Sequence, residues 1–336
     1  MISIDFDKFS LFYKNHIEQH LIDFEKERIE ILKKYRKTSV ILFKAIPTAI
    51  LLYALFLLIP EGFLPNYMLP FVIVSPVIIA FIIIIRAGVL QYDTDEQKSK
   101  SLQRLKRKVY TRLFNYLELN YNTYPSSEFN NYKDAVLKHL PENKEKYFYF
   151  MNFEDEISGE FKGINFKLCD ATIIKRYVKL YYKHGGGPVE VWLFQGLMLA
   201  AKLNKPFRTE TIIKTDSFKD FKTRKNIIKL EDEEFNKKFK VLADDEVESR
   251  YLLTTSFMER LKNFHKSKKD KTIIFFDNKC SDSKNMFILT NTGKDNFEIP
   301  LNKTLLNEKI YYNLLKELVD MLEIAVALKL GQNIGL

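Results

Sequence analysis

The chain has 336 residues, of which 29% are charged and 46% hydrophobic, and its net charge is +10. This composition excludes a disordered chain, and the length allows one or two domains with a substantial core. Two cysteines, Cys169 and Cys280, exclude a framework of disulfides and fit a reducing compartment, and the excess of positive charge favours an anionic partner.

Two apolar runs near the N-terminus predict a pair of transmembrane helices. Residues 40–59 contain a single charge, Lys44, and residues 69–85 contain none before Arg86. Twenty helical residues cover about 30 Å, which matches the hydrocarbon thickness of a bilayer. The second helix is expected to extend to residue 90, and residues 60–68 form a short external loop. The alternative is a buried core helix, which two neighbouring runs of this kind disfavour.

Basic residues lie on only one side of the apolar pair. The loop at 60–68 holds one acid and no base, whereas four bases lie at 33–37 and a longer basic run follows the second apolar segment. The positive-inside rule therefore places both termini in the cytoplasm.

Amphipathic segments flank the apolar pair at residues 7–37 and 93–119. The first carries an apolar stripe, interrupted by Arg28, of Ile17, Leu21, Phe24, Ile31 and Tyr35. The second carries Leu102, Leu105, Val109, Leu113 and Tyr116. Because both leave the same end of one helical hairpin, we expect an antiparallel stalk that also serves self-association. The predicted parts are a cytoplasmic N-terminal helix at 1–39 and a basic juxtamembrane stalk helix at 91–120.

The stalk helix contains a basic run without acids between residues 98 and 112. Its members are candidate contacts with anionic lipid: Lys98, Lys100, Arg104, Lys106, Arg107, Lys108 and Arg112. Each base near an anionic membrane surface contributes about 1 kcal/mol of attraction. The alternative is an ordinary topology signal on a solvated helix face. Nucleic-acid binding is not expected, because no recognition residues accompany the run.

Residues 121–336 predict a soluble α+β domain with a largely antiparallel sheet. Strands are expected within 151–173, where glycines mark a turn between two of them, and within 189–203 and 209–215. Three late strands are expected at 272–277, 285–290 and 297–300. Short helices separate the two groups of strands, and a long helix at 305–330 closes the chain. This order is typical of the α+β class.

Acidic residues gather at 231–248, between the two groups of strands. Asp245 with Glu248, and Ser256 with Glu259, have the spacing of capping boxes, and the acids at 231–234 suit the start of a helix. A metal cluster is the alternative, but no histidine lies among these acids. We therefore expect no metal and no cofactor.

His184 is followed by three glycines, a run that supplies an oxyanion hole in some lipases. The remaining hydrolase pattern is missing from the sequence, because no two glycines bracket a serine and the only later histidine is His265. Gly185–Gly187 are therefore expected to form a hairpin turn. His16 and His20 have i, i+4 spacing but no third ligand for a metal. Phosphate-binding loops and paired-cysteine motifs are missing as well, so we expect no enzyme and no catalytic residue.

The segments "GEFKGINFKLCDA" at 159–171, "VWLFQG" at 191–196 and "EFNKKFKVLADDEVESRYLLTTSFMERL" at 234–261 resemble the bacterial membrane-protein family catalogued as domain of unknown function 3137. The resemblance extends over residues 90–330. It departs at Glu156, where many members carry a histidine. The resemblance implies a membrane hairpin followed by a cytoplasmic domain, and it implies no activity.

These features predict a non-enzymatic, multi-pass protein of the bacterial inner membrane whose cytoplasmic domain binds a protein or lipid partner. Two alternatives stay open: a structural subunit of a larger membrane complex, and a membrane-tethered enzyme whose site no motif reveals. A deep pocket with convergent polar groups would favour the enzyme, and a flat apolar or basic surface would favour binding or assembly.

Overall fold

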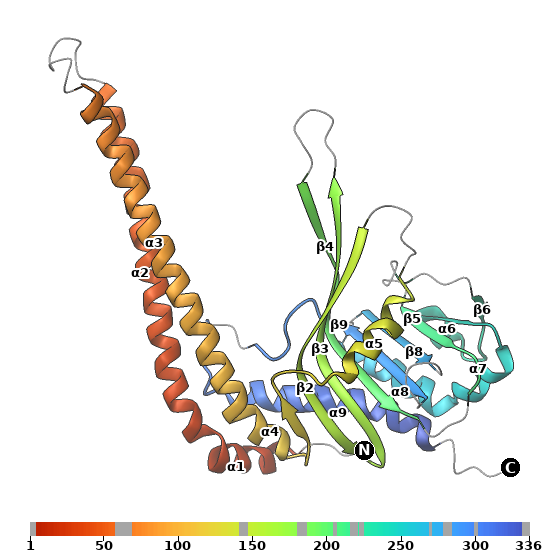
Figure 1. The fold of residues 1–336 in the computed structure, drawn as a ribbon. Coiled ribbons are helices and arrows are strands. Elements are labelled where there is room, and N and C mark those ends of the chain that lie inside the picture. Colours follow the sequence, from red (N-terminus) through yellow and green to blue (C-terminus); the bar gives the residue numbers. More distant parts are fainter. Residues whose placement is uncertain are drawn as a thin grey trace. The chain divides into compact units, whose positions relative to one another are not determined.

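The computed structural model describes residues 5–57, 69–140, 147–179, 187–203, 207–215, 221, 225–268, 271–277, 284–298 and 302–330 (Figure 1). These residues belong to two compact units. The first comprises Met1–Ile17, Val109–Ile299 and Asn307–Leu336, and the second comprises Glu18–Lys108 and Pro300–Leu306. The loop expected at 60–68 lies outside the described residues, as do many side chains between residues 42 and 84.

Two long helices, α2 (Glu18–Leu57) and α3 (Leu69–Leu105), make up most of the second unit. The Glu27 carboxylate accepts hydrogen bonds from Ser101 Oγ at 2.6 Å and from Arg104 at 2.9 Å, and the Tyr35 hydroxyl donates to Asp95. Residue 27 of α2 thus contacts residues 101 and 104 of α3, whereas residue 35 contacts residue 95. The two helices are therefore antiparallel, as expected for the stalk. Within the described residues, no helix is both long enough and apolar enough to span a bilayer.

The helix boundaries differ from those expected. The segment predicted as one helix at 7–37 is divided at Ile17, whose φ of −120° ends α1 (Phe6–His16) before α2 begins. The helix α3 runs on from the second apolar segment, so no separate stalk helix begins near residue 91. A π-helical turn, Lys106–Tyr110, and the short α4 (Thr111–Asn115) then lead into the first unit.

In the described part of the first unit, nine strands form one antiparallel sheet in the order β1-β2-β3-β4-β9-β8-β5-β7-β6. The strands are β1 (Asn120–Asn122), β2 (Tyr147–Phe161), β3 (Ile164–Lys179), β4 (Gly187–Lys202), β5 (Thr211–Thr215), β6 (Asn226–Ile228), β7 (Phe239–Ala243), β8 (Lys271–Asp277) and β9 (Asn285–Asn291). The remaining helices are α5 (Glu128–Leu137), α6 (Glu233–Lys238), α7 (Glu246–Leu252), α8 (Thr255–Lys268) and α9 (Glu308–Leu330). The predicted α+β class with an antiparallel sheet and a closing helix is confirmed.

One face of the sheet buries its side chains against α5. The cluster joins Phe129, Tyr132 and Val136 of the helix to apolar residues of seven strands, among them Ile173 and Phe194. The other face meets α9 near the β2–β3 turn, where Glu323 accepts hydrogen bonds from Lys162 and from Arg260 of α8. The strand ends farthest from that turn project beyond the rest of the sheet (Figure 1).

Two local predictions for this unit were wrong. No strand forms at Phe297–Glu298, because the Phe297 amide turns toward the carboxylates of Asp170 and Asp295, at 3.3 and 2.9 Å; residues 299–300 lie outside the description. The capping box at Ser256 and Glu259 does not form either. The helix α8 begins at Thr255, and the Thr254 hydroxyl accepts the Phe257 amide.

The acids at 231–248 act largely as expected. Asp232 accepts the Phe235 amide at the start of α6, and Asp245 accepts the Glu248 amide at the start of α7, at 2.9 and 3.0 Å. The Glu248 side chain does not return to Asp245 but accepts the backbone amides of Arg208 and Thr209. Capping and loop anchoring therefore account for these carboxylates.

Candidate functional site

The strands β2, β3 and β4 form a three-stranded ribbon with two unlike faces. On one face, which we call the open face, the rows of paired residues are Phe148–Arg176–Glu190, Phe150–Ile174–Trp192, Asn152–Thr172–Gln195 and Glu154–Asp170–Leu197. On the other, the core face, the rows include Met151–Ile173–Phe194. Side chains alternate between faces along each strand, so the two sets point in opposite directions.

A β-bulge places the tryptophan on the open face. Ile173 pairs with Phe194 and Ile174 pairs with Trp192, so Leu193 is an extra residue in β4. Without it, Trp192 and Phe194 would share a face. Instead Phe194 is 1% exposed within the core and Trp192 is 58% exposed on the open face. A bulge commonly re-aims a side chain in this way.

The outer part of the open face is aromatic. Phe148 is 65% exposed and Phe150 40% exposed, next to Trp192 in the adjoining rows. The Arg176 guanidinium lies over the Phe150 ring at 4.6 Å and donates from Nε to Glu190 at 2.8 Å. This end of the ribbon therefore exposes aromatic rings. One cation, the Arg176 guanidinium, lies among them and is paired with Glu190.

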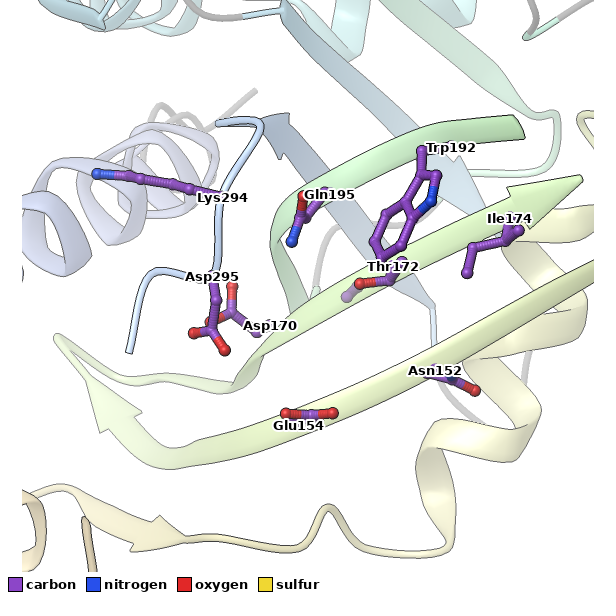
Figure 2. Close-up of a pocket in the computed structure, with 10 residues that line it drawn as sticks. Asn152, Glu154, Asp170, Thr172, Ile174, Trp192, Gln195, Lys294 and Asp295 are labelled. Carbon is purple, nitrogen blue, oxygen red and sulfur yellow. The ribbon is translucent and has the colours of Figure 1, made fainter. Parts of the chain in front are cut away.

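A pocket of about 190 Å³ continues the open face inward. Its lining residues come from the three ribbon strands and from the loop after β9: Asn152, Glu154, Asp170, Ala171, Thr172, Ile174, Trp192, Gln195, Lys294 and Asp295. Figure 2 shows Trp192 and Ile174 at one end and the carboxyl groups of Asp170 and Asp295 close together at the other. The pocket thus joins an apolar rim to a polar floor.

Three carboxylates converge beside the floor of the pocket. Asp155, Asp170 and Asp295 each place an oxygen within 4.8 Å of the others, and the first two are buried. A register shift in β2 and a φ of 57° at Asp155 turn this side chain toward the group. Oxygens of this kind suit hard cations, but each carboxylate already accepts hydrogen bonds from the protein.

Those hydrogen bonds hold the loop after β9 against β3. Asp170 accepts the Asn296 amide at 2.9 Å and its side-chain Nδ2 at 2.7 Å, and Asp295 accepts the amides of Phe297 and Glu298. The Tyr121 hydroxyl donates to Asp155. The cluster therefore has a structural role, which is to anchor the loop.

Burial raises the pKa of Asp170 well above its usual range, and the nearby Asp295 carboxylate raises it further. Hydrogen bonds from Asn296 oppose this shift without reversing it. Burial, and then the charge of Asp155, also raise the pKa of the Tyr121 hydroxyl. The floor of the pocket thus tends to retain protons, which limits repulsion between neighbouring carboxylates.

Gly196 lets the loop approach. A Cβ at this position would lie 2.1 Å from the Thr290 carbonyl oxygen and 2.8 Å from the Thr292 amide nitrogen. The Gly293 amide donates to the Gln195 carbonyl at 2.9 Å, which ties the turn after β9 to β4. Only glycine permits this contact, and the contact brings Asp295 beside Asp170.

The candidate lipid-contacting bases do not form one free array. Lys100 pairs with Glu96 at 2.6 Å, Arg104 pairs with Glu27 at 2.9 Å, and Lys106 is buried. Arg107, Lys108 and Arg112 are exposed, and Lys98 is half-buried. Lys98–Lys108 belong to the second unit and Arg112 to the first. Their contact with lipid stays a prediction.

The histidines singled out in the sequence have other surroundings. Ile17 interrupts the helix between His16 and His20, and the His16 ring lies against Phe12 at 5.0 Å. His184 and Gly185–Gly186 lie outside the described residues, but Lys179 pairs with Gly187, the register of a hairpin. Glu156, the departure from the family pattern, is buried and accepts the Ser126 amide at 2.6 Å.

No sequence motif marked the pocket. Its acids come from β2, from β3 and from the loop after β9, which follows β3 by more than a hundred positions. The available signal was Asp170, an acid inside the otherwise apolar strand segment "LCDATI". Charged residues are seldom buried without a partner, so this position suggested a polar contact but did not identify it.

Residues 192–330 match the family model described as Protein of unknown function (DUF3137), which confirms the resemblance seen in the sequence. The match begins at Trp192, within β4, and includes the loop after β9. No curated protein matches the chain. Among solved structures, the crystal structure of the mycobacterial trehalose monomycolate transport factor A, TtfA, is similar with a TM-score of 0.32 and 8% identity, covering 66% of this chain and 95% of that one.

Proposed function

We propose that this chain is a membrane-anchored binding module without catalytic activity, and that its first unit takes a protein or lipid partner on the open face. The anchor is the helical hairpin formed by the apolar runs at 40–59 and 69–85. The bases that flank these runs support a location of both termini in the cytoplasm of a bacterium, under its inner membrane. The antiparallel helices α2 and α3 offer a surface for self-association.

The exposed aromatic end of the open face carries this proposal. Phe148, Phe150 and Trp192 occupy adjoining rows and are 65%, 40% and 58% exposed. A contiguous exposed apolar patch bordered by polar groups commonly marks an interaction site. Tryptophan and arginine are also the residues that most often dominate binding energy. Trp192 also lines the rim of the pocket, so the aromatic end and the pocket belong to the same surface.

The pocket itself supports binding over catalysis. Two of its carboxyl groups, those of Asp170 and Asp295, already accept hydrogen bonds from the loop after β9, so they are not poised toward a substrate. Within the described residues, no nucleophile with an adjacent base lines the pocket. The pocket is also smaller than the roughly 300–1,000 Å³ usual for small-molecule sites. A side chain or headgroup is a better match for its size.

Photo-crosslinking in native membranes tests this proposal. p-Benzoylphenylalanine would replace Phe148 in the full chain, and in a control chain it would replace Val247, which is 78% exposed on α7. We expect position 148 to form a discrete adduct, with protein or with lipid, and position 247 to form none. Equal labelling at the two positions would show that the open face has no preferred partner.

A further inference from the structure

Building on the proposed function, we infer that the outer end of the ribbon docks onto the surface of an anionic lipid bilayer. Here the outer end means the parts of β2, β3 and β4 from the row of Phe150, Ile174 and Trp192 outward. This contact is separate from the helical anchor and belongs to the first unit. It identifies the partner of the open face as lipid.

The outer end presents apolar groups on both faces of the ribbon. Phe148 and Trp192 are exposed on the open face, while Val191, paired with Lys175, is 38% exposed on the opposite face. A folded partner that docks on one face leaves the other in water. The interfacial layer of a bilayer surrounds a narrow ribbon and covers both faces at once. The distribution of apolar groups therefore favours lipid over a protein surface.

The residue types at this end suit the bilayer interface. The strands of the outer end contain three tyrosines and the only tryptophan of the sequence: Tyr147, Tyr149, Tyr177 and Trp192. Tyrosine and tryptophan concentrate at the level of the headgroups, because their rings are apolar and their polar atoms stay hydrated. Two phenylalanines of β2 add apolar area beside them.

The charge of the same strands complements an anionic surface. The strands of the outer end hold three bases, Lys175, Arg176 and Lys179, and one acid, Glu190, which leaves a net charge of +2. Each base near an anionic membrane contributes about 1 kcal/mol. Arg176 pairs with Glu190, so the lysines supply the excess positive charge.

The acids of the pocket are too distant to cancel this attraction. Glu154 lies four residues inward from Phe150 along β2, which corresponds to about 13 Å at the rise of a strand. Physiological salt screens charges over about 8 Å. Aromatic and basic groups therefore meet the membrane, while the acidic floor of the pocket stays more than one screening length away.

The single tryptophan allows a direct test. The full chain would be reconstituted in vesicles of phosphatidylcholine with phosphatidylglycerol, whose acyl chains carry bromine, a quencher of tryptophan emission. We expect a blue shift and loss of Trp192 emission relative to detergent. Both effects should diminish in phosphatidylcholine alone and in high salt. Emission that stays unshifted and unquenched in the anionic vesicles overturns the inference.

Two variants sharpen the test. Lys175→Gln should lower the ratio of docked to free ribbon by about fivefold, the equivalent of about 1 kcal/mol. Moving the probe by combining Trp192→Phe with Val247→Trp should abolish the quenching, because position 247 lies on α7. Quenching that is equal at both positions would reflect nonspecific adsorption and would also overturn the inference.

Alkaline extraction of the same vesicles separates this inference from the anchor. If the chain resists extraction while Trp192 stays unquenched, the anchor stands and lipid docking fails. If Phe148 crosslinks to protein and not to lipid, binding at the open face stands and lipid docking again fails. Quenching of Trp192 in a chain that alkali extracts supports docking and contradicts the anchor.

Discussion

The two faces of the β2–β3–β4 ribbon come from the same strands but are covered differently. On the core face, Met151, Ile173 and Phe194 are at most 4% exposed because α5 and the neighbouring strands pack around them. On the open face, Phe150 and Trp192 lie one row away and remain in solvent. Apolar area of this kind stabilises a fold only when it is buried. The open face is therefore the surface for which we propose a partner.

Truncating a core-face ring should have the largest effect. Phe194→Ala removes a side chain that is 1% exposed and leaves a cavity, so we expect the free energy of unfolding to fall by about 3–5 kcal/mol. Urea denaturation of the full chain in detergent, followed by circular dichroism, measures the change. Phe148→Ala, on the open face, is the control and should stay within about 0.5 kcal/mol. Similar losses in both variants would contradict the distinction between the faces.

Acid should weaken the packing on the core-face side through His139. Burial lowers the pKa of His139 from 6.5 to about 4, and its ring lies against Phe275 at 4.7 Å. The unfolded chain takes up the proton near pH 6.5 while the folded chain resists it. Stability is therefore complete above pH 6.5 and falls toward pH 4, by up to about 3 kcal/mol.

The His139→Gln variant isolates this effect from other titrating groups, including Asp170, whose raised pKa acts in the opposite direction. Denaturation curves collected from pH 7 to pH 4 should show a smaller decline in the variant than in the wild type. Parallel declines would mean that His139 is protonated without loss of stability.

Gly196→Ala should have an intermediate effect at the junction of ribbon and pocket. The added methyl group would lie 2.1 Å from a backbone oxygen, so the strands must move apart, and we expect a loss of about 1–3 kcal/mol. Gly187→Ala is the matched control, because no atom lies within 4 Å of a Cβ there. Thermal unfolding distinguishes the two variants. Equal melting temperatures would show that the loop approaches β4 less closely than described.

Trp192→Ala should have the smallest effect on stability and a large effect on binding. The side chain is 58% exposed, so we expect a change in unfolding free energy within about 0.5 kcal/mol. Loss of an aromatic anchor at an interface typically weakens binding by about 2 kcal/mol or more. Adduct yield at position 148, measured with and without this substitution, gives the comparison. An unchanged yield would exclude Trp192 from the contact.

Much of the fold could be predicted from periodicity. The long strands at 147–161, 164–179 and 187–202 follow alternating or continuous apolar patterns, and α9 follows a helical one. The break between α1 and α2 at Ile17 could not be predicted, because neither glycine nor proline marks it. Phe297 and Glu298 resembled a strand locally, but the tertiary contact with Asp170 bends the chain there. The local sequence pattern therefore predicts a helix or strand correctly unless a residue distant in the sequence forms hydrogen bonds with its backbone.

The candidate site was hidden for a similar reason. Strict alternation in "VEVWLFQG" assigns Trp192 and Phe194 to one face, and only the pairing with β3 reveals Leu193 as the extra residue. Asp155, Asp170 and Asp295 come together through a bulge and a loop whose approach depends on Gly196. The residues were visible in the sequence, but their placement depends on register and close contact, which a single sequence does not encode locally.

Hydroxyl-radical footprinting of Trp192 tests most directly whether the open face is occupied. The oxidation rate of Trp192 would be compared between the full chain in native membranes and the purified chain in detergent, with Tyr251, which is 51% exposed on α7, as the internal reference. The account predicts that Trp192 is protected in membranes while Tyr251 reacts equally in both. Equal oxidation of Trp192 in the two preparations would contradict a binding role for the open face.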